Sequence, residues 1–357
     1  MAQIRSKPFG VTKEGANVTE YILSNPGGLT VSVLDYGCVI KSIIVPAKNG
    51  PVDVVVGHDT MADYEADFNS SGSTCCGAFV GRYANRIENA VFTVGGKTYK
   101  LEANNGPNHL HGCFSRKLYR VKSFGDTLLM EAESPDGEDG FPGNLKIAVR
   151  YTLTEDNAFR MDYRVSSDAD TIVNLTNHSY FNLDGGGDVL NQKLRIYASR
   201  YLEGNNQCCP TGAILPVADT PMDFTAGKLI GREIDTGFAQ TTMVGGGYDH
   251  CYVIDRARGS SQSICAWATS DKTGISMKLY TTQPGIQLYT ANFLQDCPSP
   301  GKGGKPLQKY GGFALETQHY PCSPSHPEFP STVLRAGKVF RATTTLRFFT
   351  GKQCGKL

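Results

Sequence analysis

Five short segments place ionisable or amide side chains within apolar or glycine-bounded stretches of the chain. They are Gly81-Arg82-Tyr83-Ala84-Asn85-Arg86-Ile87, Asn108-His109-Leu110-His111-Gly112, Leu175-Thr176-Asn177-His178-Ser179-Tyr180-Phe181-Asn182-Leu183, Tyr248-Asp249-His250 and Phe313-Ala314-Leu315-Glu316-Thr317-Gln318-His319. Burial of such groups without partners is costly, so these segments are the first candidates for a function. Their histidines and carboxylates could act as acids and bases, and their arginines and amides could bind hydroxyl groups. This combination suits a sugar as ligand. Aromatic side chains can cover the apolar face of a sugar.

Two of these groups also have a purely structural interpretation. His178, between Leu175 and Phe181, could be a hydrogen-bonded histidine of the core. Glu316 could be a carboxylate at the end of a strand that pairs with Arg86. Taken alone, neither residue distinguishes catalysis from structure.

The remaining candidates are open to other interpretations as well. His109 and His111 lie on one face of a strand and could hold a metal, but the spacing supplies no third ligand. Asp249 could cap the turn that follows Gly245-Gly246-Gly247. The sugar-site interpretation therefore depends on all five segments together.

The elements that must position these groups are strands. Apolar and polar residues alternate over 145–154 and again over 159–165, with the turn residues Glu155-Asp156-Asn157 between them. This period of two predicts an antiparallel hairpin with one solvated face. A second hairpin is expected around Gly95-Gly96, because paired glycines accept the positive φ of tight turns, and a strand is expected over 340–348. With no long amphipathic helix and no linker, the chain is predicted to be all-β and one domain, residues 1–357.

Composition excludes several classes of partner. The 35 basic and 34 acidic side chains give a net charge of +1, without the basic stripe that nucleic acid requires. No run of about 18 apolar residues could span a membrane, and the start of the chain lacks the apolar core of a signal peptide. We therefore expect a cytoplasmic protein with no membrane partner.

The cysteines and the C-terminus bear on the cellular compartment. The 11 cysteines are odd in number, include adjacent pairs and form no C-x-x-C, so reduced thiols in a reducing compartment are expected. Gly355-Lys356-Leu357 has the shape of a degenerate peroxisomal address, which makes a peroxisome-like organelle the alternative location.

In their order along the chain, these segments resemble the aldose 1-epimerase (galactose mutarotase) family over nearly the whole length. No single short match is specific, but an ordered set over more than about 200 residues is. The resemblance implies a large antiparallel β-sandwich with the sugar bound in an open cleft. The matching motifs are Phe9-Gly10, Asn85-Arg86, Leu110-His111-Gly112, the block Thr176–Asn182, Tyr248-Asp249-His250, Gln283-Pro284-Gly285-Ile286-Gln287 and Leu315-Glu316-Thr317-Gln318.

The resemblance also implies roles for individual residues. The catalytic acid falls on His178 and the base on Glu316, with no cofactor and no metal. The implied partner is a free aldohexose, galactose or glucose, bound by a monomer or weak homodimer. Tyr83 and Cys113 depart from the family pattern beside binding positions, which leaves the sugar preference open. The implied binding residues are Asn85, Arg86, His111, Ser179, Tyr180, Asp249 and Gln287.

The implied reaction sets the protonation states that the acid and base need. Opening a pyranose ring delivers a proton to the ring oxygen and removes one from the anomeric hydroxyl; rotation about C1–C2 and reclosure then give the other anomer. We expect protonated His178 to donate and ionised Glu316 to accept. From ordinary pKa values of about 6.5 and 4.3, this needs a modest rise in the histidine pKa, which a nearby carboxylate would supply.

Two alternative functions remain at this stage. A hexose 6-phosphate epimerase would need extra cations around C6, whereas Asp249 would repel a phosphate. A non-catalytic sugar-binding module on the same scaffold would be expected to lack an acid or a base, and both are present here.

Overall fold

The computed structural model describes residues 2–256 and 259–351. The C-terminal tripeptide Gly355-Lys356-Leu357 lies outside the described residues. Within those residues, no helix is both long enough and apolar enough to cross a membrane. Every cysteine that the structure describes is a free thiol.

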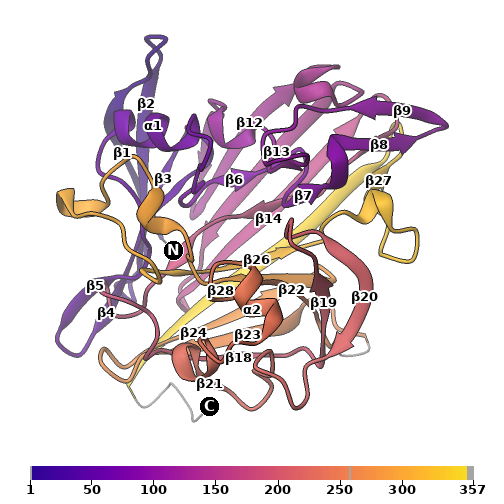
Figure 1. The fold of residues 1–357 in the computed structure, drawn as a ribbon. Helices are drawn as coiled ribbons and strands as arrows, with labels where there is room; N and C mark the ends of the chain where they lie inside the picture. The colour runs from indigo at the N-terminus through magenta and orange to yellow at the C-terminus, as the bar shows by residue number, and fades with distance from the viewer. Residues whose placement is uncertain (1, 257–258, 352–357) are drawn as a thin grey trace.

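The largest sheet has nine strands, all paired antiparallel (Figure 1). The predicted hairpin is formed by its third and fourth strands, where Leu145 pairs with Ser167 and Leu153 with Phe159. In spatial order the strands are β11 (Arg120–Phe124), β12 (Thr127–Ser134), β13 (Leu145–Leu153), β14 (Ala158–Ser167), β28 (Val339–Thr350), β24 (Ile275–Thr281), β23 (Ser263–Thr269), β18 (Lys193–Ile196) and β21 (Lys228–Leu229).

Two smaller sheets complete the main layers. One has six strands: β17 (Tyr180–Phe181), β26 (Phe313–Gln318), β25 (Gly285–Tyr289), β22 (Asp249–Val253), β19 (Arg200–Gly204) and β20 (Pro210–Pro216). The other has five: β1 (Gln3–Val11), β2 (Asn17–Ser24), β3 (Thr30–Leu34), β4 (Ile40–Ala47) and β5 (Gly50–Asp53).

Short elements connect these sheets. The two-stranded pairs are β7 (Arg86–Ile87) with β10 (His109–Leu110), β6 (Phe79–Val80) with β16 (Thr176–Asn177), β8 (Val91–Val94) with β9 (Lys97–Lys100), and β15 (Thr171–Ile172) with β27 (Val333–Leu334). The helices are α1 (Met61–Phe68) and α2 (Ala239–Met243); the 3₁₀ turns are η1 (Glu88–Ala90), η2 (Phe114–Arg116), η3 (Glu138–Gly140), η4 (Ile230–Glu233), η5 (Leu294–Asp296), η6 (Lys302–Gly304) and η7 (Ser323–Ser325).

Two other sequence predictions of local structure are confirmed. The β8–β9 hairpin turns at Gly95 and Gly96, whose φ values of 59° and 78° are the positive ones that the glycine pair was expected to supply. The C-terminal strand is β28, which lies between β14 and β24 near the middle of the nine-stranded sheet.

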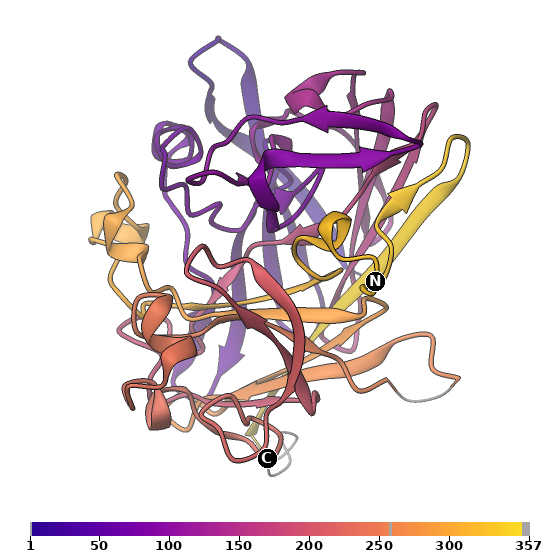
Figure 2. The same cartoon turned by 45° about the vertical axis from the view of Figure 1, so that its right-hand side comes forward.

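The six-stranded sheet packs face to face on the nine-stranded sheet (Figures 1 and 2). Leu288 and Leu315 of the smaller sheet belong to the same buried cluster as Tyr151 and Leu346 of the larger one. A hydrogen bond of 2.6 Å between the hydroxyls of Thr317 and Thr344 also joins the two layers. The prediction of an antiparallel β-sandwich is therefore confirmed.

Because side chains alternate across a strand, the six-stranded sheet has a second face that is turned away from this core. Glu316 pairs directly with Gln287, and Asp249 pairs directly with Tyr289. Since Gln287 and Tyr289 are two residues apart on one strand, all four side chains lie on that second face. This face forms the floor of the candidate site.

Candidate active site

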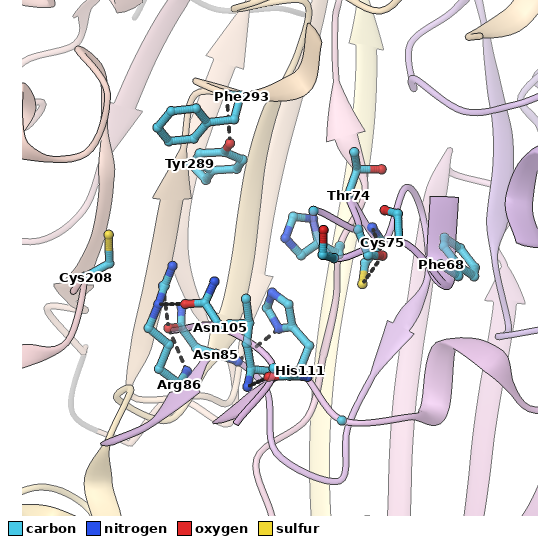
Figure 3. A pocket seen from close by; sticks show the side chains of 18 of the residues that line it. Phe68, Thr74, Cys75, Asn85, Arg86, Asn105, His111, Cys208, Tyr289 and Phe293 are labelled. Carbon is cyan, nitrogen blue, oxygen red and sulfur yellow. Dashed lines mark hydrogen bonds between the residues drawn. The ribbon is translucent and has the colours of Figure 1, made fainter. Parts of the chain in front are cut away.

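A cleft of about 900 Å³ lies over the second face of the six-stranded sheet (Figure 3). Its volume is within the range usual for small-molecule sites. Seven of the nine predicted site residues line the cleft. They come from distant parts of the chain: Asn85 and Glu316, the first and last of them, are 231 positions apart. The seven are Asn85, Arg86, His111, His178, Tyr180, Asp249 and Glu316.

His178 and Glu316 form a buried pair at the centre of this cleft. His178 Nε2 lies 3.6 Å from Glu316 Oε1, and the two side chains are 6 % and 3 % exposed. The backbone of His178 is fixed by hydrogen bonds with Ala78 and Gly77, and its ring packs on Tyr180 at a centroid distance of 4.9 Å. His178 Nδ1 and Glu316 Oε2 have no hydrogen-bond partner among the described residues, which leaves both atoms for a ligand.

Burial sets the protonation of this pair. It lowers the pKa of His178 to about 4. Burial also raises the pKa of Glu316 well above its usual value; Asp249 adds to this rise and Arg86 opposes it. The expected rise in the pKa of His178 is therefore wrong for the free site, because burial disfavours the charged imidazolium. The opposite directions of the two pKa shifts favour a neutral His178 imidazole and a protonated Glu316 carboxyl group in the free pair.

Arg86 is held by three neighbours on one side of the cleft (Figure 3). Its Nε donates to Asn105 Oδ1 at 3.0 Å, and its Nη1 donates to Asn85 Oδ1 at 3.4 Å. Its Nη1 also lies 3.9 Å from Asp249 Oδ2. The acidic partner of Arg86 is thus Asp249 rather than Glu316, so the structural interpretation of Glu316 as its ion-pair partner is wrong.

His111 is fixed in one tautomer by the backbone. The N–H of Asn85 donates to His111 Nδ1 at 3.1 Å, so the ring proton must be on Nε2. Burial, with the nearby His178 and Arg86, lowers the pKa of His111 well below its usual value, and the ring stays neutral. His111 therefore presents a neutral N–H donor to the cleft.

This tautomer also bears on metal binding. Ligand atoms of His111, His178 and Glu316 lie within 4.8 Å of one another, which would suit an ion by distance alone. However, a protonated Nε2 has no lone pair to give to a metal. His109 does not join this group: its Nδ1 contacts Glu102 O at 2.9 Å and its ring packs against Phe141. The hypothesis of a His109–His111 metal pair is therefore wrong.

Ser179 and Gln287 are not among the residues that line the cleft. The Ser179 hydroxyl donates to Asn177 Oδ1 at 2.7 Å, and the Gln287 amide donates to Asp249 Oδ1 at 2.6 Å. Both side chains are buried. In this structure Gln287 orients Asp249, and Ser179 stabilises the turn between β16 and β17.

Other lining residues were not predicted from the sequence. Tyr289 accepts the backbone N–H of Phe293 at 3.1 Å, and both rings line the cleft (Figure 3). Strand alternation could have identified Tyr289, since it stands two residues after Gln287. Asn105 had no such signal, because it lies in a loop. Cys208 also lines the cleft.

Tyr83 and Cys113, which depart from the family pattern, do not line the cleft. Tyr83 is fully buried in a cluster with Ile87 and Phe141, and Cys113 precedes η2. Their proximity to binding residues in the sequence is therefore not a contact with the site.

Comparison with known proteins gives a consistent result. A profile of the family described as aldose 1-epimerase matches residues 19–347. The galactose mutarotase of Sus scrofa is 36% identical over 354 residues, 98% of this chain and 99% of that protein. The aldose 1-epimerase of Escherichia coli K12 is 36% identical over 334 residues, 91% of this chain and 94% of that protein. An aldose epimerase homologue from C. elegans superimposes with a TM-score of 0.84 at 29% identity, covering 97% of this chain and 99% of its own.

Proposed function

The chain belongs to the aldose 1-epimerase family, and from that premise we propose that it interconverts the α and β anomers of free hexoses such as galactose and glucose. The observation that carries this proposal is the buried His178–Glu316 pair, 3.6 Å apart on the floor of an open polar cleft. An acid and a base in contact are what ring opening requires, because the two oxygens that exchange protons are bonded to the same carbon.

The pair can open the ring without consuming a proton. One member gives its proton to the ring oxygen while the other removes the proton of the anomeric hydroxyl, so the pair again holds one proton afterwards. Rotation about C1–C2 turns the other face of the aldehyde toward the C5 hydroxyl. Reclosure then returns the two protons in the opposite direction and gives the other anomer.

His178 is assigned as the acid and Glu316 as the base of ring opening. In the free site the pKa shifts favour the proton on Glu316, whose carboxyl group is 3.6 Å from His178 Nε2. Hydroxyl groups of a bound sugar that donate to Glu316 would stabilise its ionised form and lower its pKa. The proton then passes to His178, which brings both groups to the states that ring opening needs.

Fixed donors stabilise the open-chain intermediate. His111 offers its Nε2–H, and Arg86 offers the guanidinium that Asn105 and Asn85 hold in place. Such pre-oriented donors stabilise negative charge that develops on oxygen without a cost of reorganisation in the transition state. Asp249, oriented by Gln287, accepts hydrogen bonds from sugar hydroxyls.

The first test is the optical rotation of freshly dissolved α-D-galactose and α-D-glucose with and without the protein. Equilibration faster than the buffer rate is expected for both sugars. Hexose 6-phosphates serve as the comparison, since the carboxylate of Asp249 in the cleft opposes a phosphate dianion. Acceleration of the phosphates alone would refute the proposal for free sugars.

The pH dependence should follow from the single proton of the pair. We expect kcat/KM for galactose to be level across the neutral range and to fall toward pH 4, because a second proton enters the pair as His178 titrates at about 4. It should fall again at higher pH, once the raised pKa of Glu316 is passed and the pair loses its only proton. This pH dependence is tested by initial rates measured over the pH range in which the protein stays folded. A single inflection near pH 6.5, the ordinary pKa of histidine, would contradict it.

Asp249→Asn should weaken substrate binding more than turnover. Asp249 lines the cleft and is held by Gln287, but it does not contact the His178–Glu316 pair within hydrogen-bond distance. A hydrogen bond to a charged group contributes about 1.5–3 kcal/mol, so KM is expected to rise about ten- to hundredfold with a smaller change in kcat. Asp162→Asn, on β14 outside the cleft, is the control. An unchanged KM in Asp249→Asn would remove Asp249 from the binding site.

A further inference from the structure

A second cluster of potential metal ligands lies outside the catalytic cleft, where the loop after η5 meets α1. Ligand atoms of His58, Asp67 and Cys297 all lie within 4.8 Å of one another. The side chains of His58 and Asp67 are 0 % exposed. Asp67 is on α1, His58 precedes this helix, and Cys297 follows η5 more than 200 residues later in the chain.

The loop and the helix are in firm contact at this point. Ser299 Oγ donates to Asp63 O at 2.8 Å, and the N–H of Gly303 donates to Asp59 Oδ2 at 2.6 Å. The orange loop accordingly lies beside the indigo N-terminal region in both views (Figures 1 and 2). The proximity of Cys297 to His58 therefore follows from the packing of two whole segments.

The ring of His58 is oriented as metal-bound histidines are. His58 Nδ1 lies 2.7 Å from Pro300 O, and because a carbonyl oxygen can only accept, Nδ1 must be the donor. Nε2 is then the atom that faces Asp67 Oδ2, at 3.3 Å. A histidine that ligates a metal through one nitrogen almost always donates its other N–H to a carbonyl or carboxylate. His111 in the catalytic cleft has the opposite arrangement, since its Nδ1 accepts.

A second cysteine adjoins the cluster. Cys76 is fully buried, and the hydroxyl of Thr74, two residues before it, lies 2.5 Å from Asp67 Oδ2. Thr74 connects the remaining groups, because its backbone N–H donates to Asp67 Oδ1 at 2.7 Å and its hydroxyl lies 3.1 Å from Cys76 Sγ. The carboxylate is thus already oriented. One histidine, one carboxylate and two thiols make a donor set that suits tetrahedral zinc.

We propose that His58, Asp67, Cys76 and Cys297 form a structural binding site for a divalent metal ion of the zinc class. On binding, the ion displaces the proton that His58 Nε2 shares with Asp67 and one proton from each thiol, and these protons are released to solvent. Four protein ligands leave no open coordination position, so the ion would not take part in catalysis. It would join α1, the loop at Thr74–Cys76 and the loop after η5.

The first two segments, and η5 directly before the third, also form part of the wall of the catalytic cleft. Phe68, Thr74 and Cys75 line the cleft from the first two segments, and Leu294 lines it from η5. The metal site would therefore hold this wall in place without contacting the sugar.

The test uses Co²⁺ as a spectroscopic probe on the full-length protein, after removal of bound metals with a chelator and reduction of its thiols. We expect about one Co²⁺ per chain, with a thiolate-to-cobalt charge-transfer band that Zn²⁺ abolishes by displacement. Cys297→Ser and His58→Phe should each weaken Co²⁺ binding by more than about tenfold, a loss that even indirect partners of metal ligands can cause. Cys265→Ser, a thiol in the core of the nine-stranded sheet, is the matched control and should bind as the wild type does.

His178→Asn separates this site from the catalytic cluster of His111, His178 and Glu316. If the ion binds at the proposed site, this variant keeps the charge-transfer band. Loss of the band in His178→Asn, its persistence in Cys297→Ser, or its absence in the wild type would each overturn the proposal; the last result would mean that the cluster binds only a proton.

A measurement on the wild type avoids dependence on folding of the variants. Cys297 is only half-buried, so iodoacetamide should modify it in the metal-free protein. Zn²⁺ should protect Cys297 from modification, as mass spectrometry of peptides would show, but leave the rate at half-buried Cys208 unchanged. Equal modification of Cys297 with and without Zn²⁺ would also overturn the proposal.

Discussion

Glu316→Gln is expected to lower kcat/KM for galactose by at least about 10²- to 10⁴-fold, the range that one acid–base group usually contributes. The amide has nearly the same shape as the carboxyl group but can neither hold the shared proton nor accept one from the anomeric hydroxyl. Its neighbour Gln287 is already an amide, so the substitution adds no charge to the β25–β26 pair. Polarimetry from α-D-galactose, corrected for the spontaneous rate, measures the loss.

A matched control separates loss of chemistry from loss of folding. Glu20 is also a buried carboxylate, but it lies on β2 and pairs with Lys7 and Lys41 outside the cleft. Glu20→Gln should keep its turnover even if its thermal stability falls. If folded Glu316→Gln retained a tenth or more of the wild-type rate, Glu316 would not be the base.

Local structure was predictable wherever residues alternate with a period of two. The β13–β14 hairpin and the strand β28 follow directly from such alternation, because it fixes which side chains face the core. The segment around His178 shows a similar alternation, although His178 and Ser179 lie in the turn between β16 and β17. His178 and Tyr180 both line the cleft, whereas Ser179 between them turns away to bond Asn177.

The pairing of distant strands was not predictable from alternation. Asp249, Gln287 and Glu316 meet only because β22, β25 and β26 are neighbours in one sheet. Nothing in the composition of these strands specifies that order. Among the sequence signals, only the resemblance to a known family connects the three residues, and it does not reveal that Gln287 donates to Asp249.

Electrostatics was the least predictable part of the site. The expected proximity of a carboxylate to His178 is present, yet burial lowers the pKa of the histidine and raises the pKa of the carboxyl group. Burial depends on the whole fold, whereas the sequence shows only which ionisable groups exist. The single shared proton is therefore a property of the folded cleft.

The shared proton leads to a second large expected effect. The variant His178→Asn and the double variant His178→Asn/Glu316→Gln should be almost equally inactive. His178→Asn alone should lose at least about 10²- to 10⁴-fold in kcat/KM, because no group remains to protonate the ring oxygen. Once either member is gone the proton can no longer be exchanged within the pair, so removal of the other costs little more. Residues that act as one unit show such strongly non-additive losses.

The measurement is a double-mutant cycle by polarimetry, with kcat/KM of the wild type, both single variants and the double variant. We expect the double variant to fall within about tenfold of the slower single variant. His326→Asn is the control for loss of a histidine, since His326 contacts Pro210 and Glu328 and does not line the cleft. Losses that multiply would mean that His178 and Glu316 act in separate steps, and the concerted exchange of one proton within a contacting pair would then be wrong.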